Sequence, residues 1–417
     1  MDTSSRLRRP LRAAGAILAA SVMLAGGLTA CASDNSTTGS TGPTVELSAN
    51  PATGSAIKVG FISPEGGAIS LPEVRKAGEA ATRYLNENGG GIAGHKIDLV
   101  VCNEHEEPAS ATKCANQMVE QKVSAVVSPF GSMGAVMLPI ISGAGIPYIA
   151  QAPVSQAEMV SPDAFMIAGG VVSVLSAQAT QAAKEGVKKF AVILGDSGDA
   201  ASSVKALGDP MFAKAGVDFR VITVPASIAD PTPNITAALA SDKPDAVTIM
   251  GDTRQCTTTI KALQTVAPDI KKFMISTCID KPVTDAVGAE AVAGSKAFTT
   301  VNLTDQNDES VKLFRSVMAK YASDVDTSGI SYLGYQIVMS LAGVGGSLPK
   351  TDTVGPKDVM TAFRTAQNVP IPAAPGLHFT CNGKAVPMLP SICSSGILVS
   401  TISPDLKLVD TEVVNQH

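Results

Sequence analysis

A serine flanked by glycines is the first residue in this sequence whose type and setting suggest chemistry. Ser132 stands between Gly131 and Gly134, with Met133 directly after it. Glycines carry no Cβ, so a ligand carboxylate could approach both the hydroxyl and the backbone N–H groups of such a turn. A serine in front of a helix can equally serve as its N-cap. The sequence leaves both roles open: capping alone, or capping with ligand contact.

Two short motifs resemble those of an enzyme, but neither has the context that the enzyme requires. Ser202 and Lys205 form Ser-x-x-Lys, and residues 33–35 read Ser-Asp-Asn, as in penicillin-recognising enzymes. The second motif precedes the predicted fold, and Lys350 begins Lys-Thr-Asp instead of Lys-Thr-Gly. The sequence also lacks a P-loop, a dinucleotide glycine fingerprint and a Gly-x-Ser-x-Gly elbow. We therefore expect a binding protein with no catalytic residues and no cofactor.

Six of the seven cysteines fall into three local pairs. Disulfides are favoured in an exported chain, although six cysteines allow many other connectivities. Zinc is the alternative, but no Cys-x-x-Cys occurs and the four histidines stand apart in the sequence. We expect no metal. The predicted disulfides join Cys102 with Cys114, Cys256 with Cys278, and Cys381 with Cys393.

The N-terminal region, residues 1–30, has the order of a secretory signal. Basic residues precede an apolar run over residues 13–24, which is too short to span a bilayer. The sequence Leu-Thr-Ala-Cys that ends at Cys31 resembles the lipobox of bacterial lipoproteins, in which the cysteine carries a diacylglyceryl group. Cys31 is therefore the predicted lipidation site, and the polar residues 31–55 are predicted to form a flexible tether. We expect an exported protein anchored on the outer face of the cytoplasmic membrane.

The charge of the chain argues against nucleic acid as a partner, and its length favours two domains. The chain carries 37 acidic against 32 basic residues, and removing the signal deletes four arginines and one aspartate. Such an acidic balance argues against nucleic acid, whose binding needs a basic surface. The remaining chain exceeds one ordinary core, so two domains are expected. The absence of Trp predicts a core of Val, Ile, Leu and Ala.

The first half alternates buried strands with amphipathic helices. A near-continuous apolar run over 57–62 is typical of a parallel strand covered on both faces. The alternation predicts a doubly wound parallel sheet, in which ligands bind at the carboxyl ends of the strands. Ser132 stands at such a place. The strands are expected over 57–62, 97–101, 124–128 and 146–150, and the helices over 72–86, 109–121 and 135–142.

The same alternation starts again near residue 171, which predicts a second copy of the architecture. Three helices follow with little strand between them. The tail is expected to form a cysteine-bracketed hairpin over 379–393 and a last strand over 396–402. The remaining strands are expected over 189–194, 219–224, 245–250 and 273–276, and the helices over 171–185, 200–215, 253–266, 308–321, 331–343 and 356–366.

Four segments together resemble the type I periplasmic binding proteins, close to the leucine/isoleucine/valine-binding receptors of branched-chain amino acid ABC transporters. They read IKVGFISPEGG, YLNENGGGIAGHKIDLV, SPFGSMGA and GIPYIAQAP. The cysteine pairs resemble those of secreted actinobacterial members. The resemblance implies two doubly wound α/β lobes joined by three crossovers, with a small ligand between them. It places lobe one at 56–169 and 303–375, and lobe two at 170–302 and 376–412.

The resemblance also implies partners. The ligand is expected to be an amino acid or a related carboxylate, the protein partner an ABC permease, and the protein itself a monomer. A receptor that reports to a signalling partner is the alternative.

The resemblance assigns the ligand's two charged ends to opposite lobes. Ser132, Met133, Ser155 and the backbone near Ala152 match the carboxylate side. The sequence departs from the family where Thr277 replaces the usual glutamate and where Ser70 replaces a common cleft tyrosine. Asp196 or Asp252 could meet the ligand's ammonium group instead, and each could equally serve as a helix N-cap or a turn residue. The second-lobe candidates are Asp196, Ser197, Asp252, Thr253 and Thr277.

Overall fold

The computed structural model describes residues 42–67, 69–196, 198–225, 228–349 and 351–415. The predicted signal peptide, the lipidation site Cys31 and Ser197 lie outside these described residues. None of the helices in these ranges combines the length and the apolar character that a membrane span requires.

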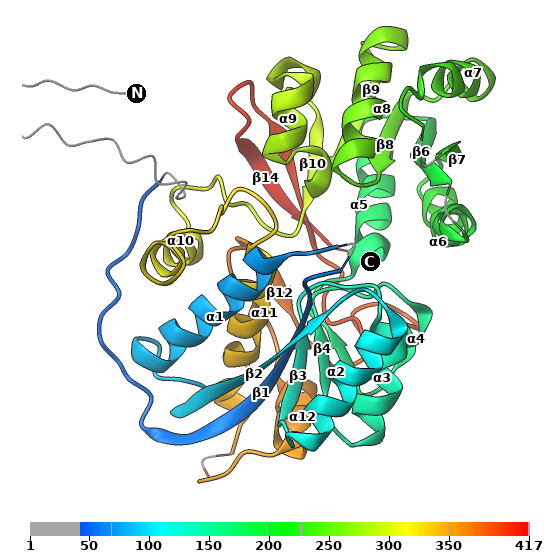
Figure 1. The fold of residues 1–417 in the computed structure, drawn as a ribbon. Coiled ribbons are helices and arrows are strands. Elements are labelled where there is room, and N and C mark those ends of the chain that lie inside the picture. Colours follow the sequence, from blue (N-terminus) through cyan, green and yellow to red (C-terminus); the bar gives the residue numbers. More distant parts are fainter. Residues whose placement is uncertain (1–41, 68, 197, 226–227, 350, 416–417) are drawn as a thin grey trace, which may run out of the picture. The chain divides into compact units, whose positions relative to one another are not determined.

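Five parallel strands form the first sheet, in the order β2-β1-β3-β4-β5 (Figure 1). Alternate residues of β1 face opposite sides: Phe61 packs in the core under α1, whereas Ile62 packs in a second core under α2 and α3. The sheet is therefore covered on both faces, as its apolar strands predict. The bounds are Gly54–Pro64 (β1), Pro72–Glu87 (α1), His95–Glu104 (β2), Pro108–Glu120 (α2), Ala125–Ser128 (β3), Gly134–Gly143 (α3), Tyr148–Ala150 (β4), Gln156–Val160 (α4) and Ala164–Met166 (β5).

Three helices from much later in the chain return to the first sheet. They are Glu309–Tyr321 (α10), Tyr332–Gly343 (α11) and Pro356–Thr365 (α12), and their apolar faces join the core that contains Phe61. Gly334 allows α11 to lie against α1, because a Cβ there would stand 1.8 Å from the carbonyl oxygen of Val74. This close packing fixes the start of α11 next to the first sheet.

Seven strands form the second sheet, in the order β14-β13-β10-β9-β8-β6-β7. The five from β10 to β7 are parallel, with α5 and α6 over one core and α7, α8 and α9 over the other. The predicted fold class is confirmed: two α/β sheets in which parallel pairing dominates. The bounds are Gly170–Lys184 (α5), Lys189–Asp196 (β6), Ala200–Lys214 (α6), Asp218–Pro225 (β7), Thr232–Asp242 (α7), Ala246–Met250 (β8), Thr253–Val266 (α8), Lys271–Ile275 (β9), Lys281–Val287 (α9) and Lys296–Thr299 (β10).

One edge of the second sheet is antiparallel, which the sequence did not predict. Ile397–Ile402 (β13) runs antiparallel to β10, and Leu408–Val414 (β14) runs antiparallel to β13. The predicted hairpin over 379–393 is also wrong. His378–Phe379 (β12) pairs instead with Val369–Pro370 (β11), and the following residues form a loop.

The segment 376–393, which the resemblance assigned to the second lobe, packs against the first sheet. Phe379 belongs to the core under α1, and Ile392 bridges to Met166 on β5. The chain returns to the second sheet only at β13. This packing differs from the expected division at residue 375 and favours a boundary in the few residues before β13.

Residues 43–52, which were predicted as part of a flexible tether, contact the folded chain. Val45 exchanges two hydrogen bonds of 2.7 Å with the hydroxyl of Ser316 on α10. The N–H of Ala52 donates to the carbonyl of Asn86 at 2.9 Å. Because backbone groups of this segment have partners in the fold, the predicted tether is too long at its carboxyl end.

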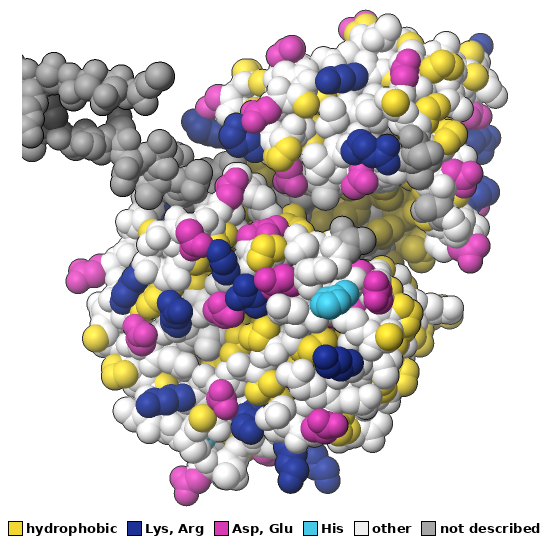
Figure 2. Space-filling view, viewed as in Figure 1, with side chains coloured by type: hydrophobic (Ala, Val, Ile, Leu, Met, Phe, Trp, Pro, Cys, Tyr) yellow, Lys and Arg dark blue, Asp and Glu magenta, His cyan; other side chains and the backbone are white. Residues whose placement is uncertain are grey.

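Sulfur atoms lie at bonding distance in the three cysteine pairs that the sequence predicts. The S–S distances are 2.00 Å for Cys102–Cys114, 2.02 Å for Cys256–Cys278 and 2.06 Å for Cys381–Cys393. Among the described residues, no group of three or more His, Cys, Asp or Glu could hold a metal ion. Acidic and basic side chains are interspersed over the face shown in Figure 2, which is the pattern of a solvated surface.

Candidate functional site

The turn that holds Ser132 follows β3 at the carboxyl edge of the first sheet. Gly134 is required there, because a Cβ on it would lie 1.8 Å from a carboxylate oxygen of Glu158. Glu158 in turn is 1 % exposed and belongs to α4, which follows the neighbouring strand β4. The turn after β3 and the helix after β4 therefore meet at one point of the sheet edge, as parallel pairing demands.

Ser132 itself binds a carboxylate of the protein. Its backbone N–H lies 3.1 Å from each carboxylate oxygen of Glu106, and its hydroxyl donates to the same group. The N-cap position of α3 is occupied by Met133, so Ser132 does not cap this helix. The donors expected to hold a ligand carboxylate thus hold a side-chain carboxylate from the loop after β2. Met133 packs, partly buried, against the core under α2 and α3.

Glu104 supports that loop from below. Its carboxylate is 2 % exposed and accepts the N–H of Glu107 at 3.0 Å. Burial raises the pKa of the Glu104 carboxyl above its ordinary value. The chain then turns through a left-handed residue, Glu106, with φ of 58°. This conformation is uncommon for a residue with a side chain and directs Glu106 towards Ser132.

Ser155 is a helix cap. Its hydroxyl accepts the N–H of Glu158 at 3.3 Å, and the Glu158 carboxylate accepts the N–H of Ser155 at 2.9 Å, which completes a capping box. The hydroxyl of buried Tyr148 also donates to Glu158 at 3.2 Å. Burial raises the pKa of Tyr148. Ala152, two residues past β4, is partly buried. A Cβ added to Gly170 would lie 3.2 Å from the Cβ of Ala152. The hydroxyls of Ser132 and Ser155 thus form hydrogen bonds with different glutamates, Glu106 and Glu158.

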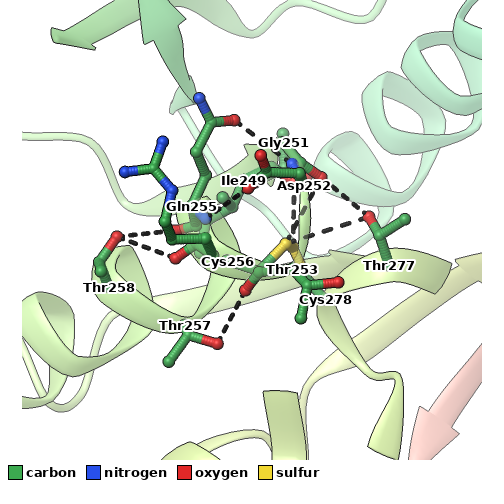
Figure 3. The surroundings of a disulfide bond; sticks show 12 residues. Ile249, Gly251, Asp252, Thr253, Gln255, Cys256, Thr257, Thr258, Thr277 and Cys278 are labelled. Carbon is green, nitrogen blue, oxygen red and sulfur yellow. Dashed lines mark hydrogen bonds between the residues drawn. A yellow bond between two sulfur atoms is a disulfide. The ribbon is translucent and has the colours of Figure 1, made fainter. Parts of the chain in front are cut away.

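Asp252 and Thr253 begin α8 at the carboxyl end of β8 in the second sheet. The side chain of Asp252 accepts the N–H of Gln255 at 2.8 Å, and the Gln255 side chain accepts the N–H of Asp252 at 3.3 Å (Figure 3). Asp252 is therefore an N-cap with a complete capping box, and its exposed carboxylate still faces solvent. Asp196, the last residue of β6, is exposed as well.

Thr277 lies beside this helix start. Its hydroxyl donates to the carbonyl of Gly251 at 3.1 Å, and the disulfide Cys256–Cys278 joins the first turn of α8 to the segment after β9 (Figure 3). The loops after β8 and β9 are thereby tied together at the carboxyl edge. Asp252, Thr253 and Thr277 form one group on the second sheet, whereas Ser132 and Ser155 belong to the first. Ser70, in the loop after β1, accepts the N–H of Gly66 at 3.1 Å.

Asp280 is a candidate that was not predicted from the sequence. It precedes α9, and its carboxylate makes no capping hydrogen bond. Burial raises the pKa of Asp280 to about 6. It lines a cavity of about 120 Å³ together with residues from the β9–α9 loop, the end of β10 and the segment after it, and the start of α11. Among them are Ser276, Thr299, Thr304 and Tyr332. An acidic residue three positions beyond Thr277 in the same loop was the available signal.

Four exposed apolar side chains stand within five residues of the carboxyl end of a strand of the first sheet. We call Ile69, Phe130, Val154 and Val171 the apolar rim; they are 41 %, 42 %, 61 % and 41 % exposed. Single exposed apolar residues are ordinary, but these four follow β1, β3, β4 and β5, at the carboxyl ends of the strands, with Val171 at the start of α5. Apolar side chains in these positions are suited to the apolar part of a ligand.

The family profile of the periplasmic binding proteins matches residues 56–388, so this chain belongs to that family. Proteins of this family bind solutes outside the cytoplasm. No curated protein matches the sequence.

Solved structures share the fold at low identity. A leucine-binding protein from Thermotoga maritima has 18 % identity and a TM-score of 0.67, with 86 % of this chain and 99 % of that one covered. A fatty acid ABC transporter substrate-binding protein from Thermomonospora curvata has 13 % identity and a TM-score of 0.70, covering 89 % and 94 %. A solute-binding protein from R. palustris, in complex with 4-hydroxybenzoate, has 16 % identity and a TM-score of 0.68, covering 87 % and 98 %.

Proposed function

We propose that this protein is the lipid-anchored solute-binding component of an ABC importer, and that it captures a small organic ligand between two closing lobes without chemistry. The observation that carries the proposal is the placement of polar side chains at the carboxyl edges of two parallel sheets. Ser132 with Glu106 lies on the first edge, and Asp252 with Thr277 lies on the second. In open α/β sheets this edge is where ligands bind.

The packing of residues 376–393 against the first sheet supports the lobe bounds that we propose. Lobe one comprises residues 56–169 and 303–393, and lobe two comprises residues 170–302 and 394–412, with a crossover after β5, after β10 and before β13. A ligand that contacts both lobes favours the closed arrangement by its differential affinity for that state. Closure also removes water and strengthens the charged hydrogen bonds around the ligand.

The ligand that we propose has an apolar body of about the size of an amino acid side chain. The apolar rim supports this, as do the ligands named for the similar proteins, which are leucine, fatty acid and 4-hydroxybenzoate. Each of those ligands combines an apolar part with a small polar head. The lipobox at Cys31 supports anchoring on the membrane, where a permease partner would receive the ligand.

A thermal-shift screen of the purified protein tests this function. The panel holds amino acids, the amines and acids with the same side chains, aromatic acids and sugars. We expect one chemical class to raise Tm and to bind with a dissociation constant near micromolar, which is about −8 kcal/mol. Thr277→Val should weaken this binding. The matched control is Thr257→Val on α8. The hydroxyl of Thr257 likewise donates to a backbone carbonyl, that of Thr253, at 2.8 Å. Equal binding by both variants, or no binding across the panel, would refute the proposal.

A further inference from the structure

The carboxylate of Glu106 accepts the hydrogen bonds that Ser132 could offer to a ligand. If the proposed solute-binding function holds, this contact affects which ligands the site accepts. The Ser132 N–H is 3.1 Å from both oxygens of Glu106, and the hydroxyl donates to the same carboxylate. A ligand carboxylate at this position would have to displace Glu106 or lie beside it. A charge-assisted hydrogen bond to a resident carboxylate is among the stronger kinds, so displacement is unfavourable.

The loop is built to keep Glu106 in this place. Gly131 has φ of 145°, and a Cβ on it would lie 3.1 Å from a Glu106 carboxylate oxygen. The loop after β1 supports the other side, because a Cβ on Gly67 would stand 2.1 Å from the carbonyl oxygen of His105. Beneath the loop, buried Glu104 holds the N–H of Glu107. Glu106 is thus confined between two glycine-containing loops.

The surrounding charges do not compensate a second carboxylate. Arg75, near the start of α1, is a strong cation that is already engaged by Glu65 at 2.6 Å and by Glu79 at 2.8 Å. His105 and Glu107 are the direct neighbours of Glu106 along the chain, with buried Glu104 one position further, and Glu158 lies behind Gly134. Like charges at short range repel, most strongly where water is excluded. A donor group such as an ammonium would instead find the free lone pairs of Glu106.

We infer that Glu106 is a specificity-determining residue, which makes this edge of the site accept an amine and reject a carboxylate. Combined with the apolar rim, the ligand class is a primary amine with a branched or aromatic apolar body. This reverses the orientation that the resemblance implies, in which Ser132 meets the ligand's carboxylate.

A matched pair of probes tests the inference: isoamylamine and isocaproate share a branched apolar chain and differ in their charged head. The protein is labelled with ¹⁵N at serine, and the Ser132 amide signal is followed during titration. We expect isoamylamine to bind the wild type at least tenfold more tightly than isocaproate. Glu106→Ala should lose this preference and should gain a saturable shift of the Ser132 amide with isocaproate. Glu107→Ala, an exposed neighbour of the same charge, should behave like the wild type.

Two results would overturn the inference. One is that isocaproate binds the wild type as tightly as isoamylamine does. The other is that the Ser132 amide of Glu106→Ala does not respond to isocaproate. Neither result would refute the proposed function. With either of them, another solute from the panel could still bind between the lobes of the wild type.

Discussion

Asp280 and Tyr332 face the same small cavity, although one precedes α9 of the second sheet and the other begins α11, which packs on the first sheet. Tyr332 is 7 % exposed, and burial raises its pKa, with the nearby charge of Asp280 adding to the shift. The carboxyl group of Asp280 is therefore kept in a poorly solvated setting by a side chain from a distant part of the chain.

This setting predicts a pH-dependent stability. Burial raises the pKa of Asp280 from 3.8 to about 6. Between these values the folded state holds a proton that the unfolded state has lost, so the stability contributed by this group falls as pH rises through the window. Asp280→Asn removes the free-energy cost of burying an ionised carboxylate. It should stabilise the protein by about 1 to 3 kcal/mol at pH 7, with little effect at pH 4. Urea unfolding at both pH values measures this.

Asp285→Asn is the matched control for that experiment. Asp285 lies on the same helix but pairs at the surface with Lys281 at 2.7 Å. Its replacement should change the free energy of unfolding by no more than about 0.5 kcal/mol at either pH. A variant of Asp280 that tracks this control would show that the Asp280 carboxyl is well solvated, which contradicts its burial beside Tyr332.

Ser155→Ala should lower stability and leave ligand affinity unchanged. The hydroxyl completes the capping box with Glu158, and loss of such a cap costs about 1 kcal/mol. Ser132→Ala is the comparison, because Ser132 does not cap α3 and the variant keeps the backbone N–H bond to Glu106. Loss of its exposed hydroxyl should therefore cost less stability than loss of the Ser155 cap. Thermal melts alongside calorimetry with the best solute of the panel separate the two effects. Reduced affinity in Ser155→Ala with unchanged Tm would place Ser155 in the ligand site.

The disulfide between the first turn of α8 and the segment after β9 should contribute to stability. Replacing Cys256 and Cys278 together by Ala should lower the free energy of unfolding by about 3 kcal/mol on the chain-entropy model. Hydrogen exchange should rise in the segment around Gly251 and Thr277, which the bond holds together. The Cys102–Cys114 double variant is the control, since it should destabilise the protein without loosening this segment.

Membrane attachment should depend on Cys31. Changing Cys31→Ala removes the thiol that we propose is acylated, so the protein should appear in the medium or remain as an uncleaved precursor. Membrane fractionation with metabolic palmitate labelling measures this. Replacing Cys102 and Cys114 together leaves the lipobox intact and should not change the fractionation. Normal processing and membrane association of Cys31→Ala would contradict lipid anchoring.

The regular parts of the fold could be predicted because buried parallel strands carry continuous apolar runs. The runs that became β1 and β6 are examples, and helix α8 begins and ends where the sequence predicts. β14 was missed since nearly all its residues are exposed and it exists through antiparallel pairing with β13. Its pairing partner, not its own pattern, decides its structure.

The candidate site was predicted only in outline. The glycines around Ser132 identified a turn that binds a carboxylate, but nothing local to the turn indicates that Glu106 supplies it. That contact depends on the left-handed backbone of Glu106 and on the adjacency of β2, β1 and β3. Asp280 was missed for a similar reason, because its burial involves Tyr332 from α11.

Hydrogen exchange with and without the best solute of the panel tests most directly whether one ligand contacts the carboxyl edges of both sheets. We expect simultaneous protection in the loops after β3 and β4, around Ser132 and Ser155, and in the loops after β8 and β9, around Asp252 and Thr277. Protection confined to one sheet, or binding of the solute with no protection in these four loops, would contradict ligand capture between the lobes.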